Sequence, residues 1–294
     1  MSAYKQQSNN IQKTWVLIFL FIGLISGVFY LFGVVNNSPY FGFIGLFLSL
    51  GQALIGYFFG DKIALASSGA KKIEYQDNPV VYEMIENLSK IAGIPVPKVH
   101  ISPDLSANAF ACGNSPKNAS ICLNQGILNL LNKNELEGVI AHELAHIKNR
   151  DILIMTVTMV LASVASFLAD IGLRMSFFGG MGKDEDDKPN AITLALYFVT
   201  IMLAPLVATM IQLAISRQRE YLADATAVVF TRYPDGLKNA LLKLYQNPTP
   251  SSHYSTAMNH FYIAPPKKTF GEKMQSFFST HPAIKDRVAA LEKM

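Results

Sequence analysis

The chain has 294 residues, of which 50% are hydrophobic and only 16% are charged, against about 25% charged residues in ordinary soluble domains. This composition argues against a purely soluble protein and against a disordered one, because so many apolar residues must pack together or enter a membrane. The net charge of +4 comes without any block of like charges, so the chain lacks the electrostatic footprint of a nucleic-acid-binding protein.

The first 60 residues are predicted to form a membrane hairpin. Residues 14–60 contain no charged side chain, and one crossing of a bilayer needs about 20 apolar residues. A polar break at residues 36–39 divides this stretch into two spans, 15–35 and 40–60. Lysines flank both ends and are absent from the turn, which predicts that both ends are cytoplasmic. A cleaved signal peptide is disfavoured, because its apolar core is only about 7–15 residues long.

Residues 61–151 have the pattern of a folded domain outside the membrane. Apolar residues at helical spacing predict an amphipathic helix over 78–92, which ends before Gly93. Residues 98–101 are predicted to form a strand, and 107–112 with 120–123 a hairpin, so we expect a small sheet. Cys112 and Cys122 do not form a CxxC pair, and we expect them to be free buried thiols.

Two further uncharged runs, 152–169 and 191–216, predict a second membrane hairpin, although the shorter first run also fits a buried core helix. Helices are expected again over 220–230 and 235–245 and near the C-terminus, with a loop over 247–268. The predicted organisation is therefore an N-terminal membrane hairpin (1–60), the first part of a catalytic domain (61–151), a second membrane hairpin (152–216) and the second part of that domain (217–294).

A metal-binding motif of the HExxH type begins at His142. The helix that carries it is expected to start at Asn132, which has a glutamate three residues later, as in a capping box. At 3.6 residues per turn, His142 and His146 project from the same face, so their imidazoles can bind one tetrahedral Zn²⁺. An apolar stripe on another face would bury the helix and leave the histidines facing a cleft.

Catalytic zinc has three protein ligands, and the third is not next to this motif. The metzincin pattern is rejected, because Asn149 and Ile152 stand where it needs glycine and histidine. Topology returns Glu220 to the side of the membrane that carries the motif. Glu220 and Asp224 share a helix face, so one can bind the metal while the other accepts a hydrogen bond from a ligand histidine. The alternative is a pair of surface salt bridges to nearby arginines.

Four segments in this order resemble the HtpX-type membrane zinc endopeptidases, bacterial relatives of the CAAX prenyl endopeptidase. They are Asn-Ala-Phe-Ala at 108–111, HExxH followed by Lys-Asn-Arg-Asp at 142–151, Arg-Glu-Tyr-Leu-Ala-Asp at 219–224 and Ser-Thr-His-Pro at 279–282. The resemblance covers nearly the whole chain. It implies a mainly α integral membrane protein with four transmembrane helices and a zincin-like α+β catalytic domain that carries a small sheet.

The resemblance also implies roles for individual residues. One Zn²⁺ per chain would be bound by His142, His146 and Glu220, with Glu143 as the general base. His281 would stabilise the transition state, with Arg287 nearby. An edge strand would pair with the extended substrate, and its residues are Asn108, Ala109, Phe110 and Ala111. Cys112 departs from the family pattern, in which threonine is common at that place, without affecting a catalytic position.

The residues together with the resemblance predict a zinc-dependent membrane endopeptidase that hydrolyses misfolded or membrane-associated proteins, and a role in quality control is what the resemblance implies. It would be a multi-pass protein of a bacterial-type inner membrane, with the N-terminus and the catalytic domain in the cytoplasm. Its expected partners are protein or peptide substrates and the lipid bilayer, with no nucleic acid, and the sequence leaves the oligomeric state open. The alternatives are a processing peptidase for lipidated or short peptides and a non-enzymatic membrane scaffold or transporter.

Overall fold

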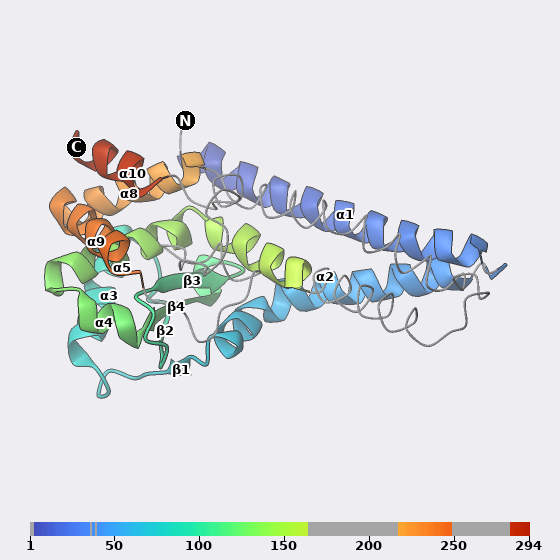
Figure 1. Ribbon diagram of the computed structural model, residues 1–294, viewed down its shortest axis with the longest axis horizontal. Helices are drawn as coiled ribbons and strands as arrows, with labels where there is room; N and C mark the ends of the chain where they lie inside the picture. Colours follow the sequence, from blue (N-terminus) through green and yellow to red (C-terminus); the bar gives the residue numbers. More distant parts are fainter. Residues whose placement is uncertain (1–2, 36, 39, 164–216, 249–282) are drawn as a thin grey trace, which may run out of the picture.

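A long helical hairpin extends from a compact mixed domain (Figure 1). The computed structural model describes residues 3–35, 37–38, 40–163, 217–248 and 283–294. Helix α1 covers Ala3–Val35 and helix α2 covers Tyr40–Ser67. The two helices approach closely, since a Cβ atom on Gly45 would lie 2.5 Å from Cβ of Phe29. Both free ends of the hairpin lie at the mixed domain, and the turn lies at the far end.

Two of the helices in the described ranges are long and apolar enough to cross a membrane, at Ser8–Leu31 and Tyr40–Ser67. This confirms the predicted pair of N-terminal candidate spans, with α2 running beyond the expected end at residue 60. The third apolar run is helical over Asp151–Ser163, which packs so closely on α2 that a Cβ atom on Gly60 would meet Thr156 at 2.6 Å. The rest of the predicted second membrane hairpin lies outside the described residues.

Within the described residues, the sheet has four strands in the order β1-β2-β4-β3, which places β3 at one edge. Strand β4 pairs in parallel with β2 and antiparallel with β3, and β1 pairs antiparallel with β2. The predicted small sheet and its hairpin are confirmed, whereas the short β1 was not expected. The strand bounds are Lys71–Lys72 (β1), Lys98–Ser102 (β2), Ala109–Gly113 (β3) and Ala119–Asn124 (β4).

Helix α5 lies at the centre of the domain. It packs against β3 and against α3, α8 and α9, and the shared core includes Ile140, Leu144 and Ile147, all with 0% exposure. The structure confirms the expected helices, whereas the short α4 was not predicted. The bounds are Pro79–Ala92 (α3), Gln125–Leu130 (α4), Lys133–Lys148 (α5), Arg217–Thr231 (α8), Pro234–Gln246 (α9) and Ile284–Leu291 (α10).

Candidate metal centre

Helix α5 aligns the two histidines of the motif. The predicted capping box is present: Asn132 Oδ1 accepts a hydrogen bond from the Glu135 amide, and Glu135 Oε2 accepts one from the Asn132 amide. One turn apart on this helix, His142 and His146 direct their Nε2 atoms at each other at 3.2 Å. Their side chains are only 1% and 4% exposed, so the histidine face is enclosed within the domain.

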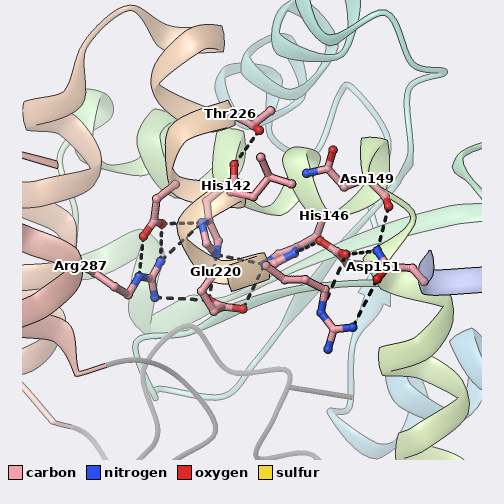
Figure 2. Close-up of polar contacts among 11 residues, drawn as sticks. His142, His146, Asn149, Asp151, Glu220, Thr226 and Arg287 are labelled. Carbon is pink, nitrogen blue, oxygen red and sulfur yellow. Dashed lines mark hydrogen bonds and ion pairs between the residues drawn. The ribbon is translucent and has the colours of Figure 1, made fainter. Parts of the chain in front are cut away.

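Helix α8 brings a carboxylate to the same point. Glu220 Oε2 lies 3.7 Å from His142 Nε2, and Glu220 Oε1 lies 3.6 Å from His146 Nε2. The three side chains form a group whose ligand atoms lie within 4.8 Å of one another (Figure 2). Glu220 and Asp224 are 5% and 1% exposed, so the alternative of surface salt bridges is wrong for both.

The other nitrogen of each histidine faces an acidic side chain. His142 Nδ1 lies 2.9 Å from Asp224 Oδ1, and His146 Nδ1 lies 2.9 Å from Asp151 Oδ2 (Figure 2). Each Nδ1 therefore carries a hydrogen that it donates to a carboxylate, which leaves the Nε2 lone pairs for a metal ion. Asp224 was expected to accept such a bond, whereas Asp151 was missed.

The donor set fits a divalent ion such as zinc. Two nitrogen ligands at about 2.0–2.1 Å from a tetrahedral zinc ion lie about 3.3 Å apart, and the two Nε2 atoms are 3.2 Å apart. The distances from the Glu220 carboxylate oxygens to these Nε2 atoms are a few tenths of an ångström longer. When both imidazoles are neutral, their facing lone pairs repel each other, so a proton or a metal cation between them would stabilise this arrangement.

Burial and neighbouring charges move the pKa values of the motif residues in different directions. Burial lowers the pKa of His142 to about 4. Burial also opposes the charged form of His146, but the hydrogen bond to Asp151 and the charge of Glu220 outweigh it and raise the pKa to about 9. For Glu143, burial raises the pKa to about 8. In the absence of metal, Glu143 and His146 therefore both hold protons at neutral pH.

Glu143 is buried next to His142 on α5 and contacts the edge strand. Its carboxylate accepts a hydrogen bond from the backbone amide of Ala111 in β3. The amide of Gly113, two residues along the same edge, donates to Thr156 Oγ1 at 3.0 Å, and the amide of Ala109 donates to the side chain of Asn108 at 2.9 Å. These three amide groups of the edge predicted to bind substrate therefore already donate hydrogen bonds to side chains of the protein.

Arg287 reaches the site from α10, close to the C-terminus. Its Nε and Nη2 atoms donate to Asp224 Oδ2 and Oδ1 at 2.8 and 2.6 Å, and Nη1 lies 3.6 Å from Glu220 Oε2 (Figure 2). The resemblance placed Arg287 near the reacting centre, and the structure puts it against the acid that holds His142. His281, the other residue of that segment, lies outside the described residues.

Three polar residues of the site were not found from the sequence. Asp151 holds His146, Asn10 contacts Asp151, and Arg219 lies near both. An acid directly after the end of the motif helix was the available signal for Asp151. A fully buried asparagine four residues before an uncharged run gives no local signal, because its partners lie far away in the chain.

Comparison with known proteins assigns the family. The model of peptidase family M48 matches residues 75–294. This chain belongs to peptidase family M48. It is therefore a metallopeptidase, and the HExxH helix and Glu220 both lie in the part that matches.

Members of this family from several bacteria align with the whole chain. A "Protease HtpX homolog" from Streptococcus gordonii is 39% identical over 297 residues, covering 99% of both chains. One from Streptococcus thermophilus is 41% identical over 304 residues, again with 99% of both covered. The crystal structure of S. mikatae Ste24p covers 98% of this chain and 67% of its own, with a TM-score of 0.53 and 21% identity, which is a likeness of fold. The resemblance drawn from the motifs is confirmed.

Proposed function

We propose that this M48 peptidase is a zinc-dependent membrane endopeptidase that hydrolyses misfolded or membrane-associated proteins at the cytoplasmic face. The observation that carries the proposal is the pair of Nε2 atoms 3.2 Å apart, each on a ring whose Nδ1 is held by a buried acid. With Glu220, these atoms offer the three protein ligands of a catalytic zinc site.

Glu143 is the residue placed to move protons. When bound, zinc would lower the pKa of a coordinated water and polarise the substrate carbonyl. Glu143 takes a proton as general base and delivers it to the leaving amine. Its buried carboxylate accepts a backbone hydrogen bond from Ala111, and its place next to His142 in the motif supports this role. His281 is proposed to stabilise the developing oxyanion.

Strand β3 is proposed to hold the substrate as an added strand. The predicted substrate residues are Asn108 and, in β3 itself, Ala109 to Ala111, and the amide of Ala111 donates to Glu143. Among the described residues, β3 has a neighbouring strand on one side only. A peptide that pairs there would replace Glu143 as the partner of the Ala111 amide. Substrate binding would thereby release the carboxylate next to the scissile bond.

The membrane part of the proposal is supported by the outer surface of the hairpin. Large apolar side chains are exposed along it, including Phe19 at 67%, Phe43 at 63% and Phe47 at 69%, which water would disfavour and a bilayer would cover. The lysine-bearing ends of the hairpin lie at the catalytic domain, which supports a cytoplasmic site. Proteolysis of the domain in inverted vesicles but not in intact spheroplasts would test this orientation.

A matched pair of variants tests the enzymatic proposal. Glu143→Gln is expected to retain zinc and to lose about 100- to 10,000-fold in cleavage rate, because the general base is gone. Glu137→Gln removes a carboxylate from the same helix outside the metal group and should leave the rate unchanged. Near wild-type cleavage by pure, metal-loaded Glu143→Gln would refute the assigned base, and zinc-free purified wild type would refute the metal.

Substrate class requires a second assay. Purified enzyme in detergent is compared on unfolded casein, on a destabilised membrane protein and on a prenylated peptide. The proposal expects cleavage of the first two. Cleavage of the prenylated peptide alone would favour a processing peptidase and reject the quality-control role.

A further inference from the structure

The N-terminal end of α1 reaches the metal centre from the other end of the sequence. Asn10 is only 1% exposed. Its Nδ2 atom donates to Asp151 Oδ1 at 2.6 Å and to the carbonyl of Asn149 at 3.2 Å. The second oxygen of Asp151 lies 2.9 Å from His146 Nδ1. Asn10 is thus separated from a metal-ligating imidazole by a single carboxylate.

Both ends of the Asn10 amide are used. Its Oδ1 accepts a hydrogen bond from Arg219 Nη1 at 3.5 Å, and Arg219 Nε lies 4.0 Å from Asp151 Oδ1. Arg219 directly precedes the metal-group residue Glu220 in α8. The Asn10 side chain therefore connects the residues that follow the HExxH helix with the helix that carries the third carboxylate.

This arrangement fixes the orientation of a carboxylate. Asp151 is 0% exposed, so no water can replace a missing hydrogen bond to either of its oxygens. A bond to each oxygen prevents rotation of the carboxylate, and that holds the His146 ring in the plane that directs Nε2 at His142. Removal of a residue that orients a metal ligand in this way typically weakens metal binding about 10- to 100-fold.

We propose that Asn10 is a positioning residue for the ligand His146, so that the first candidate membrane helix completes the metal centre. The inference rests on the proposed zinc function and extends it. Asn10 lies far outside residues 75–294, the part that the family model matches. The matched region alone thus lacks one element of its own metal site.

The competing explanation is that Asn10 only anchors α1 to the domain. Trp15, the single tryptophan, separates the two explanations, because it lies on the same helix and stacks on Tyr57 of α2 with ring centroids 5.9 Å apart. Loss of anchoring would change the Trp15 emission. Loss of carboxylate orientation would change zinc affinity while that emission stays the same.

The test uses full-length protein in detergent and chelator-buffered zinc titrations. Asn10→Ala is expected to bind zinc about 10- to 100-fold more weakly than wild type, with unchanged Trp15 emission. Asn10→Asp keeps the size of the side chain but replaces the donor by an acceptor, and is expected to weaken binding at least as much. Asn9→Ala is the matched control, since the neighbouring asparagine makes no side-chain hydrogen bond within the described residues, and should bind zinc like wild type.

Activity gives a second readout. Asn10→Ala should lose cleavage at limiting free zinc and regain it at saturating zinc, which a purely structural role would not produce. Wild-type zinc affinity in both Asn10 variants would overturn the inference, as would a loss accompanied by altered Trp15 emission and not restored by zinc. Failure of the proposed function looks different, because wild type itself would then bind no zinc or cleave nothing.

Discussion

Replacing Arg287 by methionine tests how the buried charges of the site depend on one another. Arg287 is 0% exposed and holds both oxygens of Asp224 through short hydrogen bonds of 2.8 and 2.6 Å. Methionine keeps much of the length and apolar volume of the side chain and removes the guanidinium. Asp224, 1% exposed, would keep His142 as its partner in the site but lose its charge partner.

The expected loss follows from the geometry. Removing one member of a buried, hydrogen-bonded ion pair costs about 3–5 kcal/mol, because the remaining charge is stranded away from water. At about 1.4 kcal/mol per factor of ten, this moves the folding equilibrium by roughly two to four decades. Adding Asp224→Asn to Arg287→Met removes the stranded charge, so the double variant should lose less stability than the sum of the single variants.

The measurement is denaturant unfolding of metal-free protein in detergent, so that changes in zinc binding do not contribute. Arg217→Met is the matched control, since Arg217 lies exposed at the start of α8 and should change stability by less than about 0.5 kcal/mol. A loss below about 1 kcal/mol for Arg287→Met, the range of exposed pairs, would refute the reasoning. Strict additivity in the double variant would do the same.

Three further predictions concern other parts of the site. Gly138→Ala in α5 should destabilise the protein by about 1–3 kcal/mol, because the added Cβ would lie 2.5 Å from the backbone of α9. Alanine is the better helix former, so calorimetry that finds stabilisation would contradict this close approach. Zinc affinity should rise with pH from about 6.5 to 9, by at least about tenfold per pH unit, because the metal displaces a proton from His146, whose pKa is raised to about 9. Buffered zinc titrations at several pH values that find no pH dependence would exclude this displacement. The raised pKa of His146 also stabilises the metal-free fold. This contribution to stability is fully present below about pH 6.5 and is lost as the pH rises through 9. Thr156→Val should cost about 1–3 kcal/mol by leaving the buried Gly113 amide unpaired, whereas Thr158→Val, whose hydroxyl has no hydrogen bond in the described ranges, should be neutral in the same unfolding assay.

The parts of the site that follow local rules were predictable from the sequence. Asn132 and Glu135 form a capping box because both sit at fixed positions of a helix start. His142 with His146, and Glu220 with Asp224, share a face because four residues make about one helical turn. The edge position of β3 was implied by the resemblance alone, because strand order depends on pairings that no periodicity reports.

The parts that were missed depend on chain reversals. Helix α5 ends at Lys148, and Arg150 adopts a positive φ of 58° before the next helix begins at Asp151. That turn brings Asp151 back to His146, and a non-glycine residue with positive φ gives no sequence signal. Asn10 meets Asp151 across 141 residues, and its contacts exist only because the start of α1 lies at the domain (Figure 1).

The charges enclosed around the histidines explain why these distant residues are needed together. The described part of the site buries more acidic than basic side chains: Glu143, Asp151, Glu220 and Asp224 against Arg219 and Arg287. With neutral histidines this leaves a net charge of −2, which a buried site must compensate. The pKa values of His146 and Glu143, raised to about 9 and about 8, mean that two protons supply the compensation when metal is absent. A divalent cation provides the same charge at one point, so zinc binding is coupled to the release of these protons. Any residue that orients the buried acids, including Asn10, therefore affects both zinc binding and protonation.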